Sequence, residues 1–501
     1  MSNSIPKYWV NTKLGSVTEY GKSTKKTLND VGDSTWILEL EDIEKDSSRV
    51  IKRVNASNRP FKSTKNTFEK GNVLYGKLRP YLNKIILADE NGVCSTEIVP
   101  IDAEPNCLNK YLFYWLKSST FIDYVVDASY GVNMPRLGTK DGNAAPLVLA
   151  PFAEQQEIAN QLDSLLAKVD SIKNRLDTVP NIIKRFRQSV LASAVSGKLT
   201  EDYRKETKQK SVDVRHVAER QFNLGLTKGN FGKKNTFSPD IHGEELVNCV
   251  THIDGYPLVR IGAICESVVP NRDKPKTFSG GYHWLLTPHF SEQSIYIDYN
   301  RIERGLNKEE VNKYNAKIIK ENNVIMTCVG RLGLSAILEE NAVINQQLHA
   351  FIVNEYILPE YLAYCIRANQ SFYESKATST TIPYLNKTSC NSLPIPLPSI
   401  NEQKVILEQV EQLLSFADKV EQKVIAAQER VNNLTQSILA KAFRGELTSE
   451  WRELNQALIT GENSAEALLA KIKAERDALS KTQSTKKKPV KKQTTPRKAQ
   501  N

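Results

Sequence analysis

The first stretch with residues suited to chemistry is a turn near the N-terminus that contains glycine and lysine. Gly15, Gly21, Lys22 and Ser23 resemble a loop that holds phosphate groups with backbone N–H groups and a lysine. The spacing is wrong for that motif, because five residues separate the glycines where four are needed, and Ser16 stands where glycine is required. We therefore interpret this stretch as a surface turn with a basic tip.

Other catalytic signatures do not occur in the sequence. There is no Asn/Asp-Pro-Pro-aromatic methyltransferase motif, and Pro239-Asp240 lacks the following Glu-x-Lys of nucleases. The six histidines, between His216 and His349, have no metal-ligand spacing. The seven cysteines form no Cys-x-x-Cys, which argues against a zinc or disulfide framework and suits a reducing compartment. We expect a chain that binds and positions rather than reacts, with no catalytic residue and no metal.

Charge and hydropathy restrict the class further. No run of about 18 apolar residues occurs and no signal sequence opens the chain, so we expect a soluble, cytoplasmic protein without membrane contact. The net charge is +11, but eight Lys/Arg and no acid lie from Lys481 onward, which leaves +3 for the other residues. Composition alone therefore does not indicate a basic domain, and the tail is predicted to be a disordered appendage.

One stretch of the chain occurs twice, and the elements that position the rest are organised around it. Residues 154–200 recur at 402–448 with a constant spacing of 248 and no gap. Glu154-Gln155 recurs as Glu402-Gln403, and the helix-ending Gly197 recurs as Gly445. This regularity over 47 positions indicates a duplicated unit.

Each repeated stretch is predicted to be a long helix with a coiled-coil seam. Apolar residues step by four and three from Ile158 to Val190 and from Ile406 to Ile438. A stripe of about 50 Å does not keep a helix ordered alone, so we expect the two helices to bury their stripes on each other, antiparallel. Pro180 predicts a kink near Thr178 within one continuous helix. Gly197 and Gly445 suit left-handed caps.

Similar patterns before each helix predict two similar domains with different loops. Asn72 to Tyr75 corresponds to Asn323 to Met326, and Pro146 to Pro151 corresponds to Pro394 to Pro398. The predicted fold class is α/β (α+β), with two similar globular domains separated by an antiparallel pair of long helices in a pseudo-two-fold repeat. The expected segments are a first domain at 1–150, a first helix at 151–200, a linker at 201–247, a second domain at 248–398, a second helix at 399–450, a C-terminal helix at 451–480 and a basic tail at 481–501.

Two similar domains on a stiff spacer suit a ligand with two sites at a fixed distance. Duplex DNA is such a ligand, because equivalent faces recur every helical turn of about 34 Å. The repeated helices would also offer two like surfaces to two copies of a partner.

These residues resemble the specificity subunits of type I restriction–modification systems, over nearly the whole chain. The resemblance rests on the junctions Pro146 to Gln156 and Pro394 to Gln403 and on the helix ends Ala192 to Leu199 and Ala440 to Leu447. It implies two target-recognition domains that each read one half of a split, asymmetric double-stranded DNA sequence. It also implies that the helices hold two methyltransferase subunits, at the spacer residues Leu165, Leu166, Leu413 and Leu414.

The resemblance places the chemistry on partner subunits. The methyltransferase subunits would bind S-adenosylmethionine and flip out an adenine for N6 methylation, and restriction subunits would add ATP- and Mg-dependent translocation and cleavage. This chain would bind no cofactor.

Within the two domains, loop residues are the candidates for contact with DNA. Arginine and asparagine can pair with guanine and adenine edges, whereas lysine more often contacts phosphate. The candidates are Lys22, Lys25, Lys26, Lys77, Arg79, Tyr81, Lys84, Asn133 and Arg136 in the first domain, and Arg272, Lys274, Lys276, Arg331, Tyr384, Asn386 and Lys387 in the second.

Three other interpretations stay open. The chain could be a coiled-coil adaptor whose two domains bind proteins, an enzyme with unrecognised chemistry, or the specificity subunit of a system that only methylates. Steep loss of DNA affinity with salt and preference for a bipartite site would separate the first of these from a DNA-reading protein.

Overall fold

The computed structural model describes residues 5–485, apart from 132, 209–210, 233–236, 238, 251–256, 271–273 and 379–380. The chain divides into two compact units, residues 1–177 with 426–501 and residues 178–425. Each unit contains one globular domain and part of each of two 44-residue helices, α5 (Phe152–Val195) and α13 (Ile400–Phe443). The candidate Arg272 and the predicted tail from residue 486 onward lie outside the described residues.

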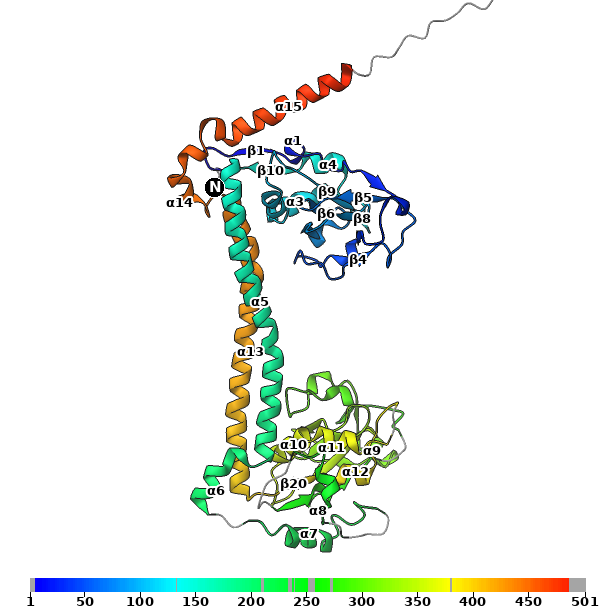
Figure 1. The fold of residues 1–501 in the computed structure, drawn as a ribbon. Coiled ribbons are helices and arrows are strands. Elements are labelled where there is room, and N and C mark those ends of the chain that lie inside the picture. Colours follow the sequence, from blue (N-terminus) through cyan, green and yellow to red (C-terminus); the bar gives the residue numbers. More distant parts are fainter. Residues whose placement is uncertain are drawn as a thin grey trace, which may run out of the picture. The chain divides into compact units, whose positions relative to one another are not determined.

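The first domain combines small sheets with short helices (Figure 1). Its described strands form sheets of order β2-β5-β8-β3-β4, β7-β6-β9 and β1-β10, in which only β3 and β8 pair in parallel. The elements are β1 (Val10–Lys13), α1 (Leu14–Val17), β2 (Lys25–Lys26), β3 (Trp36–Leu38), β4 (Val54–Asn55), β5 (Lys65–Phe68), β6 (Val73–Gly76), β7 (Ile85–Leu87), β8 (Gly92–Cys94), β9 (Ile98–Ile101), α2 (Asn109–Leu116), α3 (Ser119–Ala128), α4 (Thr139–Ala144) and β10 (Pro146–Leu149).

The second domain repeats this plan. Its described strands form sheets of order β12-β19-β16-β17, β14-β13-β18-β15 and β11-β20, again with one parallel pair of strands, β13 and β18. The elements are β11 (Leu258–Arg260), α8 (Ile261–Ile264), β12 (Glu266–Val268), β13 (Tyr282–Leu285), β14 (Gly305–Leu306), α9 (Lys308–Lys313), β15 (Ile318–Ile319), β16 (Val324–Thr327), β17 (Ser335–Ile337), β18 (Ala342–Ile344), β19 (Leu348–Ile352), α10 (Pro359–Ala368), α11 (Gln370–Ser375), α12 (Lys387–Asn391) and β20 (Pro394–Pro396).

A close backbone contact shows how far the two plans agree. In the first domain, a Cβ on Gly15 would lie 2.9 Å from Cβ of Asn143, and in the second a Cβ on Gly262 would lie 2.4 Å from Cβ of Asn391. Both approaches bring the short helix after the first paired strand against the short helix before the last one. Only glycine fits at such a distance, so the same packing constraint applies in both domains.

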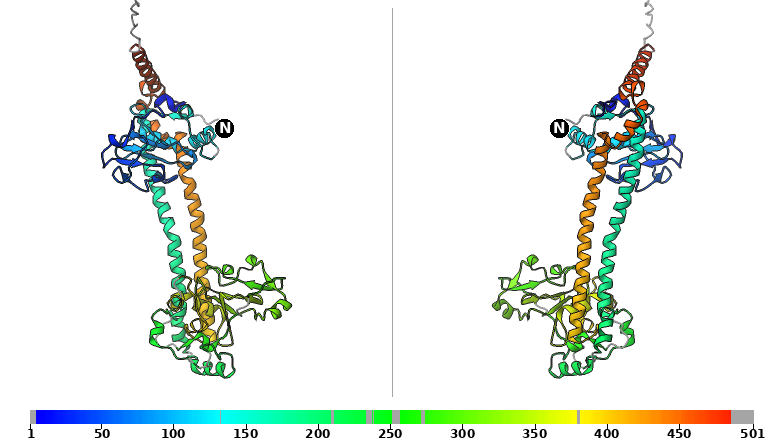
Figure 2. Two further views of the ribbon diagram at one scale, coloured as in Figure 1. Left: turned by 90° about the vertical axis from the view of Figure 1, so that its right-hand side faces the viewer. Right: turned by 90° about the vertical axis from the view of Figure 1, so that its left-hand side faces the viewer.

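The long helices run antiparallel within each unit, where Figures 1 and 2 show their segments side by side. In the first unit, Nε2 of Gln428 donates to Oδ1 of Asp177 at 3.0 Å. In the second unit, Nη2 of Arg187 lies 2.6 Å from Oδ1 of Asp418. The predicted fold class, two similar α/β domains with an antiparallel pair of long helices, is confirmed.

Half of the predicted seam positions are buried, and most of the others are half-buried. Ile158, Leu162 and Val169 in the first unit and Ile406 and Val410 in the second are at most 5% exposed. Two predicted seam residues depart from the pattern, because Ile172 is 45% exposed and Leu434 is 41% exposed. A regular period identifies a stripe, but the local separation of the helices decides how deeply each position is buried.

The predicted helix ends are confirmed. Gly197 has φ 70° and Gly445 has φ 76°, the left-handed region that glycine enters without steric cost. After Gly445, the N–H of Glu446 donates to the carbonyl of Lys441 at 2.9 Å, which satisfies a carbonyl in the last turn. α5 continues through Pro180 as one helix, as predicted. The kink near Thr178 stays a prediction.

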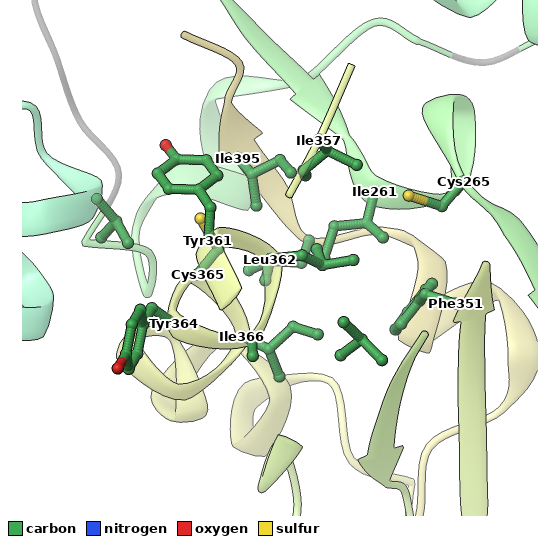
Figure 3. Close-up of a cluster of buried hydrophobic side chains, with 14 of the residues drawn as sticks. Ile261, Cys265, Phe351, Ile357, Tyr361, Leu362, Tyr364, Cys365, Ile366 and Ile395 are labelled. Carbon is green, nitrogen blue, oxygen red and sulfur yellow. The ribbon is translucent and has the colours of Figure 1, made fainter. Parts of the chain in front are cut away.

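The core of the second unit is centred on α10. Figure 3 shows Tyr361, Leu362 and Cys365 of this helix in one cluster with Ile395 of β20 and Ile261 of α8. The corresponding core of the first unit includes Trp115 of α2, whose ring packs edge-on against Phe443 of α13 at 5.0 Å between centroids. In each unit, therefore, the globular domain and its helix segments share one hydrophobic core.

Two segments pack more closely than their polar composition predicts. Between the long helix α5 and β11, helices α6 (Glu201–Thr207) and α7 (Val214–Asn223) form, and Val217 and Ala218 of α7 are buried in the second-domain core. After α13 come α14 (Ser449–Leu454) and α15 (Ala465–Thr485), and Nη1 of Arg476 donates to the carbonyl of Gly15 in α1 at 2.5 Å. A few buried apolar residues, among them Val217 in α7 and Ile472 in α15, attach these polar segments to the two cores.

Candidate nucleic-acid interface

Two loops that are far apart in the sequence lie side by side in the first domain. The strand loop (residues 77–84) follows β6, and the return loop (residues 130–131 and 133–138) precedes α4. The N–H of Arg79 donates to the carbonyl of Pro135 at 2.7 Å, and the N–H of Leu137 donates to the carbonyl of Lys77 at 3.0 Å. Leu78 and Arg136 form an antiparallel β-bridge. Two loops that contain predicted DNA-contact residues therefore form one continuous surface.

The second domain contains the same arrangement. Its strand loop (residues 328–334) follows β16, and its return loop (378 and 381–386) precedes α12. The N–H of Gly330 donates to the carbonyl of Pro383 at 2.8 Å, and the N–H of Leu385 donates to the carbonyl of Cys328 at 2.9 Å. Val329 bridges Tyr384 as Leu78 bridges Arg136. We call each such pair of a strand loop and a return loop the paired loops.

The side chains on the paired loops differ although the backbone contacts are the same. The equivalent hydrogen bonds and β-bridges of the two domains align Lys77 with Cys328, Arg79 with Gly330, and Arg136 with Tyr384. The first domain therefore has three cations where the second has a buried thiol, a glycine and an exposed phenol. Such a change alters what the surface can hydrogen-bond without altering the frame.

Most first-domain candidates are accessible to solvent. Lys25, Lys26, Arg79 and Asn133 are exposed, and Tyr81 is 50% exposed. Lys22 is exposed and lies 2.5 Å from the carboxylate of Glu19. These residues therefore lie at the surface, and Lys22 shares its ammonium with a neighbouring carboxylate.

Lys84 has a different environment from the other candidates. Its ammonium donates to the carbonyl of Leu40 at 2.7 Å, which ties the strand loop to the sheet. It is half-buried, so this lysine contributes to holding the loop in place.

A polar hollow of about 200 Å³ lies beside the paired loops of the first domain. Its wall includes the basic residues Lys25, Lys77 and Arg136, the aromatic residue Tyr130 and the hydroxyl residues Ser23 and Thr139. Cations, hydroxyls and an aromatic ring gathered in this way suit phosphate and base edges.

In the second domain, the return loop has side chains committed to the fold. Oδ1 of Asn386 accepts the N–H of Ser389 at 2.8 Å and caps α12. Lys387 is half-buried. Its pKa is lowered mainly by burial and also by the positive charge of the nearby Lys317. Tyr384 keeps 47% of its surface exposed.

The other second-domain candidates are exposed. Lys274 and Lys276 lie before β13, outside the paired loops. Arg331 lies in the strand loop, is half-exposed and pairs with the carboxylate of Glu292.

Each pair of helix leucines packs on the core of its own unit. Leu165 and Leu166 are partly buried against the first-domain core, and Leu413 and Leu414 against that of the second. Their partial exposure leaves some apolar surface on the helices.

The role of the repeated Glu-Gln pair was missed at the sequence level, although its repetition was visible. Glu154 is fully buried, and its carboxylate accepts from Trp9 Nε1 at 2.7 Å, Thr448 Oγ1 at 2.7 Å and Arg452 Nε at 2.8 Å. In the second unit, Oε1 of Glu402 accepts from Thr200 Oγ1 at 2.7 Å and Arg204 Nη1 at 3.0 Å. Each long helix thus begins at a carboxylate that binds the segment following the other helix.

Gln155 and Gln403 have a matching role. The N–H of Leu108 donates to Oε1 of Gln155, and the N–H of Leu358 donates to Oε1 of Gln403, both at 2.8 Å. Each glutamine binds the residue before the first helix of its domain's helical pair, so the repeated pair sets where the long helix leaves the domain.

The described part of the chain contains no group of three or more His, Cys, Asp or Glu residues that could hold a metal ion. No helix among those residues is long and apolar enough to cross a membrane.

A duplicated α/β domain with the same paired loops, different loop chemistry and long antiparallel helices defines a class of recognition scaffolds. The chain belongs to the family of type I restriction–modification specificity subunits, since the model of the type I restriction modification DNA specificity domain matches residues 6–181 and 254–429. The two matches are 248 residues apart, the spacing of the internal repeat. The predicted family is confirmed.

Individual relatives agree with this assignment. The chain is 34% identical over 402 residues to the type I restriction enzyme EcoBI specificity subunit of Escherichia coli, covering 79% of this chain and 78% of that protein. It is 34% identical over 372 residues to the EcoKI specificity subunit of Escherichia coli (strain K12), covering 74% and 72%.

Among solved structures, the HsdS subunit from Thermoanaerobacter tengcongensis matches with a TM-score of 0.54 at 17% identity, covering 88% of this chain and 98% of that one. A chain from a structure of the type I R-M system matches with a TM-score of 0.58 at 17% identity, covering 88% and 99%. These likenesses concern the fold alone.

Proposed function

We propose that this chain reads a bipartite, asymmetric DNA sequence, with each globular domain binding one half through its paired loops. The observation that carries the proposal is the repeated backbone frame with different side chains at aligned positions. The same frame presents its loops in the same way, while different donors and acceptors on the loops select different bases. Two domains of one chain would then recognise two different half-sites.

The proposal assigns the chemistry to partner subunits. Two methyltransferase subunits that bind S-adenosylmethionine would dock on the long helices, where Leu165, Leu166, Leu413 and Leu414 retain some exposure. Restriction subunits that use ATP and Mg would complete the complex. This chain would supply the DNA sequence specificity and no reacting group.

Mapping of N6-methyladenine in a host that carries the complete system tests the proposal. The expected result is a split motif, two short defined sequences separated by a fixed number of unspecified bases. Deletion of the gene for this chain should abolish methylation at that motif. A continuous motif, or methylation that survives the deletion, would contradict the proposal.

Binding of the assembled methyltransferase complex to duplex DNA gives an independent check. We expect affinity for the mapped motif to exceed affinity for random duplex by at least about 10³-fold, and both to fall steeply with salt. A protein-binding adaptor would show neither preference for the motif nor this salt dependence.

A further inference from the structure

Arg136 in the return loop of the first domain is held by a carboxylate from outside the paired loops. Nε of Arg136 lies 3.3 Å from Oε1 and 3.2 Å from Oε2 of Glu97. Glu97 immediately precedes β9, and its carbonyl accepts the N–H of Lys77 at 3.0 Å. One residue therefore contacts the backbone of the strand loop and the side chain of the return loop.

The position of the arginine backbone is also fixed. The N–H of Arg136 donates to the carbonyl of Tyr130 at 2.9 Å, and the N–H of Tyr130 donates to the carbonyl of Arg136 at 3.2 Å. Because backbone and Nε are both restrained, the plane of the guanidinium has little freedom left. A side chain restrained in this way loses less conformational entropy when it binds a ligand.

The outer edge of the guanidinium remains available. Nη1 makes one long contact, 3.4 Å to the carbonyl of Met134, and among the described residues Nη2 has no hydrogen-bond partner. Each Nη carries two hydrogens, so the edge formed by Nη1 and Nη2 keeps a donor on each nitrogen. The side chain is 37% exposed and lines the hollow beside the paired loops.

We propose that Arg136 reads a guanine in the half-site of the first domain and that Glu97 is the residue that positions its guanidinium. This inference rests on the proposed function and names one base contact within it. Two parallel N–H donors match the O6 and N7 acceptors of guanine in the major groove, the contact that arginine makes most often with a base. Adenine presents a donor at N6 in place of O6, so the same edge rejects it.

The second domain provides a contrast within the same chain. Register places Gln347 at the position of Glu97 and Tyr384 at that of Arg136. Oε1 of Gln347 accepts from Thr287 Oγ1 at 2.9 Å and from Asn345 Nδ2 at 3.2 Å, so it serves the fold of its own loop. The shared frame therefore does not require the carboxylate–arginine pair, which leaves the pair available for recognition in the first domain.

A purely structural ion pair is the competing explanation. Partly exposed pairs contribute little to stability, and this one is 37% and 28% exposed at its two side chains. The two explanations predict opposite effects on binding. If Glu97 only balanced charge, its neutralisation would remove a repulsion from DNA and strengthen binding to every sequence.

The test uses the assembled methyltransferase complex and duplexes that carry the mapped motif or each single-base change in it. For Arg136→Ala we expect affinity for the motif to fall about 10- to 100-fold, with discrimination lost at one guanine of the first half-site. For Glu97→Gln we expect a smaller fall, about 5- to 10-fold, with weaker discrimination at the same guanine and an unchanged second half-site. The double variant should bind no worse than Arg136→Ala alone, because Glu97 acts through Arg136.

Glu90→Gln is the matched control. It neutralises a half-exposed carboxylate of the same domain, paired with Arg53 away from the paired loops, and should leave discrimination unchanged. Stronger binding of Glu97→Gln to motif and random DNA alike would overturn the role of Glu97. Equal losses of Arg136→Ala on all duplexes would show a phosphate contact and overturn the guanine assignment. Absence of any sequence preference in the unmodified complex would instead refute the proposed function itself.

Discussion

At the scale of single residues, one pair of aligned positions shows an arginine in a backbone conformation that normally favours glycine. Arg79 has φ 49° at a position where the second domain has Gly330 with φ 74°. The left-handed region is unfavourable for a residue with a side chain by about 1–2 kcal/mol. An exposed arginine in this conformation is unlike what folding stability alone selects, which supports its candidacy for DNA contact.

Exchange of side chains at this position should separate stability from binding. Arg79→Gly is expected to raise the free energy of unfolding of the first domain by about 1 kcal/mol, because the strain is released, and to weaken binding to motif and random DNA by the same factor. The reciprocal Gly330→Ala, which meets no atom within 4 Å, should destabilise the second domain by a similar amount. Denaturant unfolding and titration with both DNAs measure these effects. A loss of stability in Arg79→Gly would contradict the strain argument.

A second residue-scale prediction concerns pH. Burial lowers the pKa of His349 to about 3, with Lys387 adding to the effect, and Nε2 lies 2.9 Å from Ser267 Oγ. The unfolded chain therefore takes up a proton near pH 6.5 that the folded chain takes up only near pH 3. Stability contributed by neutral His349 is present above pH 6.5 and is lost as the pH falls toward 3, by up to about 1.4 kcal/mol per pH unit.

The variant His349→Gln isolates this contribution. Its own stability will differ because the ring packs on Phe351 at 4.7 Å between centroids, so the slope with pH is the relevant measurement. Between pH 6 and 4, the free energy of unfolding should fall less steeply in the variant than in the unmodified chain. Identical slopes would mean that His349 is protonated in the folded state as readily as in water.

At the scale of elements, the buried carboxylates at the helix starts join segments that are distant in the sequence. The carboxylate of Glu154 accepts hydrogen bonds from Trp9, Thr448 and Arg452, so the residue before β1, the start of α5 and the segment after α13 meet at one side chain. In the second unit, Glu402 joins the start of α13 to the segment after α5 through Thr200 and Arg204. A buried charge that loses its partners is strongly unfavourable, so such a network fixes how these elements fit together.

Disruption of this network should be severe and local. Glu154→Ala leaves Arg452 16% exposed and without its carboxylate, and should lower the free energy of unfolding by about 3–5 kcal/mol. Thr448→Ala removes one hydroxyl donor and should lower it by about 1–2 kcal/mol. Glu450→Gln, an exposed carboxylate in the same segment, is the control and should change it by less than about 0.5 kcal/mol. Thermal unfolding ranks the three, and equal effects would contradict the assignment.

At the scale of the whole molecule, one frame is used twice with separate cores and separate loops. Arg331 in the second strand loop has no counterpart cation at its aligned position, Pro80. Its pair with Glu292 is about half-exposed at both side chains, so the pair itself contributes little to stability. The arginine is therefore free to exchange this carboxylate for a base edge.

Variation of one domain should alter one half of the recognised sequence. Arg331→Ala is expected to weaken specific binding by about 1–3 kcal/mol and to relax one position of the second half-site, with the first half-site unchanged. Arg301→Ala, which removes an exposed arginine paired with Asp298 in the same domain, should have little effect. Methylation mapping with each variant supplies the readout. Equal loss on specific and random DNA would identify a phosphate contact, and changes in both halves would contradict independent reading.

From the amino-acid sequence alone we predicted the duplication, the two long helices with their seam, their glycine caps and the family. These follow from local periodicity, backbone preference and a constant spacing, which act over a few residues at a time. The sequence also identified the two loops of each domain, but not that they are hydrogen-bonded to each other. Pairing of Lys77 with Leu137 and of Cys328 with Leu385 depends on a chain reversal of more than fifty residues, which no local pattern encodes.

Which candidate residues are exposed to a ligand, and which have partners within the protein, could be seen only after folding. Lys84 and Asn386 are residue types that often contact DNA. In this structure Lys84 binds the carbonyl of Leu40, and Asn386 caps α12. Glu97 and Glu154 gave no signal through their residue type, and their roles come from partners brought close by folding. Ile172 and Leu434 follow the seam period and are nevertheless exposed. The reason is the same in each case. The burial of a side chain and its hydrogen-bonding partners depend on distances between segments, and packing of the whole unit sets these distances.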